Sequence, residues 1–204
     1  MGDRGALLVI SAPSGSGKGT VIDELMRINS DVVTSVSVTS RKPRIGEVEG
    51  QHYFFVESET FHSMVREDKF IEWDSYGENH YGTTKEFIRQ KISEGKDIAF
   101  DITIKGAFEI KRQFPEAILV FLLAPSFSEL KRRLESRETN SSSEILWRLT
   151  EAKKEIEAID RFDYFLINEV AAETARKLDA IISAEKCRVR RYRLPIELEE
   201  FLKY

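Results

Sequence analysis

The sequence predicts an α/β fold in which a parallel sheet is covered by helices on both faces. Short, continuous apolar runs recur along the chain, as expected for strands buried between two layers of helices. Segments with helical periodicity alternate with these runs. The chain has 204 residues, of which 41% are hydrophobic and 32% charged, and is therefore long enough for one globular domain with small insertions.

The predicted elements begin with a strand and then alternate. The predicted strands are Ala6–Ser11, Asp97–Ile102, Ala117–Ala124 and Asp163–Ile167. The predicted helices are Gly17–Ile28, Thr84–Ser93, Lys105–Gln113, Ser126–Ser136, Glu144–Ile159 and Ala171–Cys187. The apolar positions of the segment 144–159 share one helix face, and they are Ile145, Leu149, Ala152, Ile156 and Ile159.

Two segments interrupt this alternation. From about Val32 to Thr83 the chain contains the β-rich stretches "VVTSVSVT" and "HYFFV", then "FIEWDSYGENHYG", which predicts two short strands around Gly77–His80. The polar stretch "ETNSSS" separates two helices. We therefore expect a single domain over 1–204, with its core at 1–35, 84–133 and 149–204. A small, mostly β insertion is expected at about 36–83 and a second insertion at about 134–148.

The bulk composition excludes several classes of protein. A net charge of −4 argues against broad nucleic-acid binding, which needs a basic surface. No apolar run approaches the length of a membrane span, and no signal-peptide pattern opens the chain. The lone Cys187 excludes an internal disulfide, so the expected location is the reducing cytoplasm. The basic tail "KCRVRRYR" is interpreted as a solvated helix face or as a contact in a homo-oligomer.

A glycine-rich loop follows the first predicted strand. The stretch "SAPSGSGKGT" runs from Ser11 to Thr20, between a buried strand and the start of a helix. Its glycines let backbone N–H groups approach an anion, and the helix N-terminus adds partial positive charge. Lys18 is placed to reach the outer phosphates of a nucleoside triphosphate. The alternative is an ordinary Gly/Ser turn before a helix.

The loop departs from the usual phosphate-binding pattern at two positions. Ala12 stands at the first glycine, and Gly19 stands where Ser or Thr supplies a direct ligand for Mg²⁺. Because Mg²⁺ dehydrates reluctantly, we expect water and the phosphates to hold the ion, with the Thr20 hydroxyl nearby.

Arginines cluster in both predicted insertions. Arg41 and Arg44 in "TSRKPRIGE" present two forked guanidinium groups that suit a dianionic phosphate. Arg133 and Arg137 lie four residues apart on one helix face, and Arg148 follows the "ETNSSS" bend. A bend flanked by arginines suits a lid over a transferring phosphoryl group. The alternatives are a solvated basic loop for the first set and weak surface ion pairs for the second.

Together these segments resemble guanylate kinases. The resemblance is carried, in this order, by "SAPSGSGKGT", "SVSVTSRKPRIGEVEGQHYFFV", "FIEW", "YGT", "DIT" and the arginine spacing R-x3-R-x10-R. It spans about Leu7 to Glu185, and "SRKPRIGEVEGQHYFFV" is its most specific block. It implies a P-loop kinase core with a GMP-binding insertion and a lid, which correspond to the insertions at about 36–83 and 134–148.

The resemblance also implies a GMP site. The residues assigned to it are Ser37, Arg41, Arg44, Tyr53, Glu72, Tyr81, Thr83 and Asp101. Both arginines and both tyrosines are expected to hold the phosphate, and the remaining side chains, apart from Asp101, to meet the guanine. A carboxylate such as Glu72 can accept both the N1–H and the exocyclic amine of guanine, whereas adenine offers no such pair. The alternatives are an outward strand position for Glu72, beside core Ile71 and Trp73, and ordinary packing for the tyrosines.

The ATP site and the catalytic set follow from the same resemblance. The residues assigned to ATP are Ala12, Pro13, Ser14, Gly15, Ser16, Gly17, Lys18, Gly19, Thr20, Arg133, Arg137 and Asn168. The residues assigned to catalysis are Lys18, Arg41, Arg133, Arg137 and Arg148. Asp101 is expected to organise the region shared by GMP and Mg²⁺. Asn168 is expected near the adenine, and its alternative role is to cap the end of a strand.

Two further departures from the family pattern stand out. Thr103 replaces the second aspartate of the family's "D-I-D", which removes one carboxylate near the site. Glu138 replaces the glycine that usually follows the middle lid arginine.

The implied reaction is ATP + GMP ⇌ ADP + GDP with Mg²⁺, and dGMP should also be accepted. The attacking phosphate oxygen is already anionic, so none of His52, His62 and His80 is needed as a general base. Two alternatives remain: a non-catalytic guanylate-kinase-like module that binds proteins, and a kinase for another nucleoside monophosphate.

Overall fold

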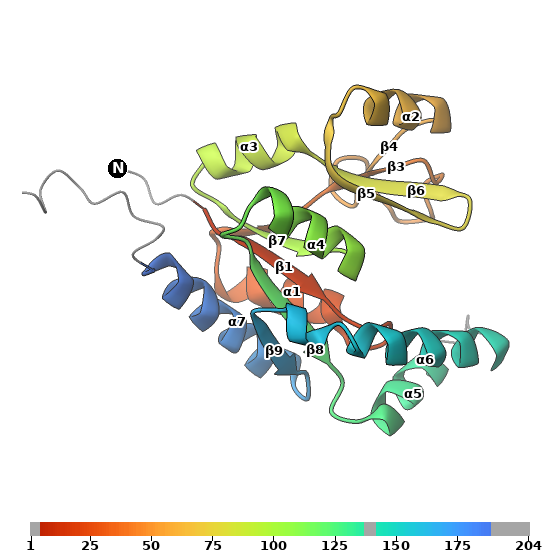
Figure 1. Cartoon of the computed structure of the whole chain (residues 1–204), viewed down its shortest axis with the longest axis vertical. Coiled ribbons are helices and arrows are strands. Elements are labelled where there is room, and N and C mark those ends of the chain that lie inside the picture. Colours follow the sequence, from red (N-terminus) through yellow and green to blue (C-terminus); the bar gives the residue numbers. More distant parts are fainter. Residues whose placement is uncertain (1–4, 137–141, 189–204) are drawn as a thin grey trace, which may run out of the picture.

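The computed structural model describes residues 5–136 and 142–188 of the chain (Figure 1). Its centre is a five-stranded parallel sheet with the strand order β2-β7-β1-β8-β9. The strands of this sheet are β1 (Leu7–Ser11), β2 (Val32–Thr34), β7 (Asp97–Asp101), β8 (Ile118–Leu123) and β9 (Tyr164–Ile167). Because the chain passes from β1 first to β2 and later to β8, the strand order reverses beside β1. Ligands of such sheets bind at this point, outside the carboxyl ends of the strands.

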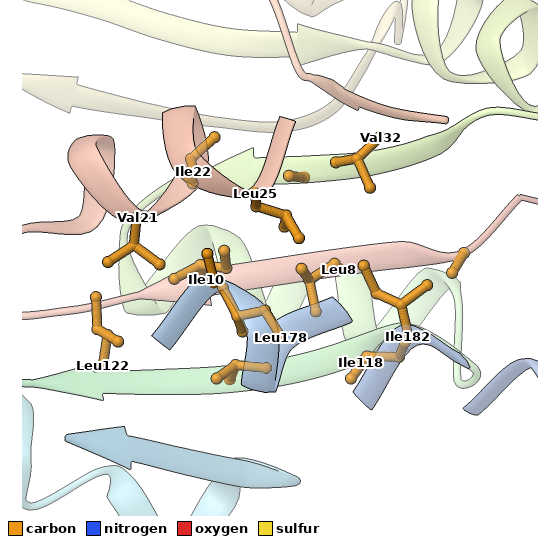
Figure 2. Close-up of a cluster of buried hydrophobic side chains, with 14 residues drawn as sticks. Leu8, Ile10, Val21, Ile22, Leu25, Val32, Ile118, Leu122, Leu178 and Ile182 are labelled. Carbon is orange, nitrogen blue, oxygen red and sulfur yellow. The ribbon is translucent and has the colours of Figure 1, made fainter. Parts of the chain in front are cut away.

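Helices cover both faces of the sheet, as the sequence predicted. On one face lie α1 (Lys18–Ile28) and α7 (Ala171–Lys186), and on the other α3 (Lys85–Ser93) and α4 (Ile104–Gln113). Figure 2 shows the cluster on the first face, where side chains of β1, α1 and α7 gather. Leu8, Leu25 and Leu178 in this cluster are fully buried. Each such side chain contributes about 1.5–3 kcal/mol to folding, so the cluster holds the carboxyl end of β1 firmly in place.

A second sheet forms a separate layer above the first (Figure 1). It has four strands in the order β4-β3-β6-β5. These strands are β3 (Ser37–Thr39), β4 (Tyr53–Phe55), β5 (Phe70–Tyr76) and β6 (Asn79–Thr84). The β5–β6 hairpin turns at Gly77, whose φ of 62° is in the left-handed region that suits glycine. The mostly β character predicted for this part of the chain is therefore present.

Two features of this region differ from the sequence interpretation. The stretch "VVTSVSVT" was grouped with the β-rich insertion, but it is divided between the two sheets. Val32–Thr34 joins the central sheet as β2 by parallel pairing with β7, in agreement with the core expected at 1–35, and only Ser37–Thr39 joins the small sheet. Helix α2 (Ser58–Arg66) was not predicted at all. It packs through the fully buried Phe61, which stacks on Phe70 of β5 with 4.6 Å between ring centroids.

Helices α5 (Phe127–Glu135) and α6 (Ser142–Ile156) lie on the opposite side of the molecule from the small sheet (Figure 1). The short 3₁₀ helix η1 (Ile159–Arg161) follows α6. Leu134 of α5 and Ala152 of α6 are fully buried where the two helices pack together. Most of the "ETNSSS" stretch, with Arg137 and Glu138, lies outside the described residues, as does most of the basic tail. Within the described ranges, no helix combines the length and the apolar character that a membrane span requires.

Candidate active site

A cavity of about 460 Å³ opens at the carboxyl ends of β1 and β7 and faces the small sheet. Residues 12–19 of the glycine-rich loop line one end of it. The small sheet contributes side chains of β3, β4, β5 and β6, and α6 contributes Glu155. Two predicted binding regions, far apart in sequence, thus share one cavity.

The glycine-rich loop turns sharply into α1. Gly15 and Gly17 have φ values of 93° and 86°, which non-glycine residues rarely adopt. Gly17 stands at the N-terminus of α1, and a Cβ atom built there would lie only 2.6 Å from Asn168 Nδ2. The loop therefore needs glycine at position 17 both for its backbone angle and for space. The structure supports a phosphate-binding loop over an ordinary turn, because loop and helix N-terminus both line the cavity.

Lys18 reaches across the cavity floor to β7. Its Nζ lies 2.6 Å from Asp101 Oδ1 and donates a hydrogen bond to the carbonyl oxygen of Ile102 at 3.2 Å. The same carbonyl accepts a 2.8 Å bond from the hydroxyl of Ser11. The ammonium group is thus held at the point where the loop, β1 and β7 meet.

Two of the predicted lid arginines contact the loop. Arg148 Nη1 donates to Ser14 Oγ at 2.8 Å, and Arg133 donates to the carbonyl oxygens of Ser16 and Asn168 at 3.4 and 3.2 Å. Arg133 and Arg132 also bind Glu129, and these bonds lower the pKa of that carboxyl to about 2. Asn168 follows β9, and its side chain donates to the carbonyl oxygen of Ser16 at 2.8 Å. Arg137 lies outside the described residues.

The small sheet presents a buried carboxylate to the cavity. Glu72 is only 5% exposed, and its Oε1 accepts bonds from the hydroxyl and the N–H of Thr83 at 2.7 and 3.1 Å. The Thr83 hydroxyl lies 3.4 Å from that of Ser37. Burial raises the pKa of Glu72, the bonds from Thr83 lower it, and the negative charge of Asp74 raises it further. Among the three residues predicted for the base, Glu72 and Ser37 line the cavity and Thr83 supports Glu72 from behind.

A β-bulge explains why Glu72 faces inward. Phe70 pairs with Thr84 while Glu72 pairs with Thr83, so Ile71 is an extra residue in β5. Ile71 is buried in the core cluster of the central sheet, and Trp73 is 45% exposed. The alternative of an outward Glu72 between two core neighbours is therefore wrong. Simple alternation does not apply across a bulge, which explains the misleading pattern.

Three of the four predicted phosphate-holding residues lie together, and they are Arg41, Tyr53 and Tyr81. Neither Arg41 nor Arg44 is among the residues that line the cavity. The Arg41 guanidinium lies 5.4 Å from the ring centroid of Tyr53, and the rings of Tyr53 and Tyr81 meet edge to face at 5.9 Å. Both tyrosines line the cavity. Arg41 Nη2 donates to Glu47 Oε1 at 2.7 Å, and the backbone N–H of Arg44 donates to Glu47 Oε2 at 2.7 Å. These two bonds lower the pKa of Glu47 to about 2, and Glu47 in turn raises the pKa of Arg41.

The sequence interpretation missed several residues around the cavity. Asp74 and Ser75 of β5 and Glu155 of α6 all line it, and Glu47 orients Arg41. Burial raises the pKa of Glu155, and the nearby charge of Lys18 lowers it. A signal was available for Asp74, because it lies two positions after Glu72 in the same strand and so faces the same side. None existed for Glu155, which looks like a polar position of an amphipathic helix.

The donor set around the loop fits Mg²⁺ that arrives with a nucleotide. Carboxylate oxygens of Asp101 and Glu155 line the cavity, and oxygen is the ligand that Mg²⁺ prefers. No group of three His, Cys, Asp or Glu side chains that could hold a metal ion occurs within the described ranges. Thr20 is exposed on α1 and is not part of the cavity lining, so its contact with Mg²⁺ stays a prediction.

Comparison with known proteins agrees with this geometry. The sequence profile of the guanylate kinase family matches residues 4–185. The chain belongs to the guanylate kinase family. It is 43% identical to a guanylate kinase of Caldanaerobacter subterraneus subsp. tengcongensis, over 92% of this chain and 91% of that protein. It is 42% identical to a guanylate kinase of Clostridioides difficile, over 97% and 96% of the two chains.

A solved structure of the guanylate kinase family has the same fold. The crystal structure of guanylate kinase from Anaplasma phagocytophilum superposes with a TM-score of 0.78 at 31% sequence identity. The match covers 98% of this chain and 95% of that one. The P-loop kinase core and its second, smaller sheet, which the sequence predicted, are therefore confirmed as the fold.

Proposed function

We propose that this protein transfers the γ-phosphoryl group of ATP to GMP and releases ADP and GDP. One observation supports the assignment above all: a phosphate-binding loop and a buried carboxylate suited to guanine line the same cavity. Membership of the guanylate kinase family supports the same reaction. A role as a non-catalytic protein-binding module has no support from any feature of the cavity.

On the donor side, Lys18 and the backbone N–H groups of residues 14–20 bind the phosphates of ATP, and Ala12 and Pro13 complete the loop. Lys18 is paired with Asp101, so the incoming phosphates must replace Asp101 as the partner of the ammonium group. Arg133, Arg137 and Arg148 stabilise the charge that spreads over the transferring group. Arg148 suits this role because its Nε is buried and has no hydrogen-bond partner in the described part of the chain. Asn168 stands beside the loop, at the adenine end of the proposed site.

On the acceptor side, Arg41, Arg44, Tyr53 and Tyr81 bind the phosphate of GMP. Glu47 holds the Arg41 guanidinium against the Tyr53 ring, so that less conformational freedom is lost when the phosphate binds. Glu72 accepts the N1–H and one amine N–H of guanine, with Ser37 and Thr83 beside it. In the GMP-binding insertion proposed at 36–83, the base-facing side chains and both tyrosines come from four strands of one sheet, and the arginines come from the segment between β3 and β4. This arrangement supports a fixed position of the base relative to the phosphate.

The chemical step needs positioning and charge stabilisation more than proton transfer. A GMP phosphate oxygen, already anionic near neutral pH, attacks the γ-phosphorus, and the bond from γ-phosphorus to the bridging oxygen of ADP breaks. Mg²⁺ bound with the phosphates would supply further neutralisation of their charge. Asp101 would hold the ion, with the Thr20 hydroxyl as a partner through water. Closure of the lid proposed at 134–148 excludes water, which would otherwise accept the phosphoryl group.

The test is an assay of ADP release with ATP, Mg²⁺ and each nucleoside monophosphate in turn. We expect GMP and dGMP to be phosphorylated, because none of the assigned side chains requires the ribose 2′-hydroxyl. AMP should be poorer by about 10⁴-fold in kcat/KM, since Glu72 faces a lone pair at N1 of adenine. Equal turnover of AMP and GMP would refute the guanine assignment.

The location and assembly of the protein belong to the same proposal. We place it in the cytoplasm, where the exposed lone thiol of Cys187 would stay reduced. Its partners are the small-molecule nucleotides rather than nucleic acid or a membrane. Association into a homo-oligomer is tested by sedimentation of the full chain, where a mass above that of one chain would support it.

A further inference from the structure

We propose that Asp74 is a second guanine-recognition residue, which accepts the amine N–H that Glu72 leaves free. The inference rests on the proposed function, since it concerns the same base in the same cavity. It starts from position: Asp74 and Glu72 are two residues apart in β5, so both side chains face one side of the strand. Both line the cavity, whereas the intervening Trp73 is 45% exposed and does not.

The Asp74 carboxylate is fixed in place by α4. Lys105 Nζ donates to Asp74 Oδ1 at 2.9 Å, and the Thr103 hydroxyl donates to Oδ2 at 3.3 Å. Thr103 is also the N-cap of α4, where its hydroxyl oxygen accepts a 3.2 Å bond from the N–H of Gly106. Each carboxylate oxygen can accept more than one hydrogen bond, so Asp74 is both oriented and still able to accept.

The contact between Thr103 and Asp74 gives a structural role to the threonine that replaces the second aspartate of "D-I-D". The sequence alone indicates only that a carboxylate is missing from the turn after β7. In the structure a carboxylate reaches the same turn from the opposite wall, on β5, and the Thr103 hydroxyl binds it. The pair Thr103–Asp74 thus keeps a negative charge at this point of the cavity.

Guanine has a use for a second acceptor. Its Watson–Crick edge carries the N1–H and an amine with two N–H groups, and one carboxylate can accept only one amine N–H together with N1–H. In a cavity closed to water, the remaining N–H weakens binding unless another acceptor meets it. The other carboxylates of the described cavity lining are less suited. Asp101 is already paired with Lys18, and Glu155 belongs to α6 rather than to the small sheet.

The experiment compares GMP with IMP, which lacks the exocyclic amine but keeps N1–H. In the Asp74→Ala variant, kcat/KM for GMP should fall about 10- to 100-fold, as expected for a lost bond to a charged acceptor. The value for IMP should change less than about 3-fold, because IMP has no amine for Asp74 to bind. Asp74→Asn keeps the shape of the side chain. It should lower kcat/KM for GMP less than Asp74→Ala does, and it should leave kcat/KM for IMP unchanged.

Asp31→Ala is the matched control. Like Asp74, Asp31 is paired with a lysine, and its carboxylate lies 3.0 Å from Lys96 Nζ. Asp31 is not among the residues that line the cavity. We therefore expect kcat/KM for GMP and for IMP to be unchanged in this variant. Equal losses for GMP and IMP in both Asp74 variants would overturn the proposal and assign Asp74 to the shape of the cavity. Unchanged GMP turnover would overturn it as well. If the parent protein does not phosphorylate GMP, the proposed function fails instead.

Thr103 is a positioning residue in this proposal, and its test is rescue by a similar side chain. Thr103→Val removes the hydroxyl and should lower the preference for GMP over IMP, whereas Thr103→Ser should restore it. A preference that is the same in all three proteins would show that the Thr103–Asp74 bond does not matter for the base.

Discussion

At the residue scale, the carboxylate of Glu72 is under two opposing influences. Guanine recognition needs it ionised, yet burial raises its pKa and favours the neutral form. The hydroxyl and N–H of Thr83 offset part of this cost, because both donate to Glu72 Oε1. In the role proposed for it, Glu72 is ionised in a buried position, and this ionisation lowers the stability of the folded state.

The variant Glu72→Gln separates the proposed role of Glu72 in binding guanine from the effect of its buried charge on stability. Because the folded state binds the Glu72 proton more tightly than the unfolded state, the parent loses stability relative to the variant as pH rises from about 4.5 through the raised pKa. We expect Glu72→Gln to be at least as stable as the parent at pH 8, measured by urea unfolding. Its kcat/KM for GMP should fall about 10²- to 10⁴-fold, from two bonds of about 1.5–3 kcal/mol each.

The pH series provides its own control. Below pH 4 both states of the parent carry a neutral Glu72, so the stability difference from the variant should stop changing there. A difference that is constant from pH 4 to pH 8 would contradict a raised pKa for Glu72. A variant that unfolds far more easily at every pH would show that the residue holds the fold rather than the base.

Residue types at the site were predictable from the sequence, but their partners were not. Lys18 and Arg41 stand out by their motifs, whereas their pairing with Asp101 and Glu47 depends on distances between separate segments. Neither Asp74 nor Glu155 carries a motif. Strand alternation from Glu72 could have indicated Asp74, whereas only the cavity reveals Glu155.

At the element scale, the glycine-rich loop and α1 form one unit whose glycines are not equivalent. Gly17 has a positive φ and lies against Asn168, whereas Gly19 is inside α1 and has no atom within 4 Å of its would-be Cβ. The same substitution should therefore have opposite effects at the two positions.

Gly17→Ala should lower the free energy of unfolding by about 1–3 kcal/mol, through a strained φ and a contact with Asn168. Gly19→Ala should raise it by at most about 1 kcal/mol, because alanine has the higher helix propensity. Urea unfolding followed by tryptophan fluorescence measures both. Equal stabilities of the two variants would contradict the loop geometry.

Most elements of the central sheet were predictable because buried strands are short apolar runs and the helices are periodic. Two elements were not. Helix α2 has its apolar residues at Phe61, Met64 and Val65, a helical spacing that the β-rich surroundings masked. Strand β2 has only three residues, too few to show which of two sheets it joins.

At the scale of the whole molecule, the cavity exists because two sheets meet over the carboxyl ends of β1 and β7 (Figure 1). Ile71 links them, since it belongs to β5 and is buried in the core of the central sheet. No local pattern in the sequence specifies this contact. Only the resemblance to a known family could therefore indicate how the two sheets are arranged relative to each other. The arrangement places the proposed ATP phosphates and the proposed GMP site on opposite walls.

The central claim is that donor and acceptor bind at separate places in one cavity. The most direct test is calorimetric titration of ATP and of GMP into the parent and into Lys18→Ala, together with a turnover assay. Lys18 belongs to the glycine-rich loop, and its ammonium group contacts Asp101 and the carbonyl oxygen of Ile102 rather than a side chain of the small sheet. We therefore expect the variant to keep its GMP affinity within about 3-fold, while ATP binds at least 10-fold more weakly and kcat falls by at least about 100-fold. An equal loss of GMP and ATP affinity in a folded variant would contradict the account.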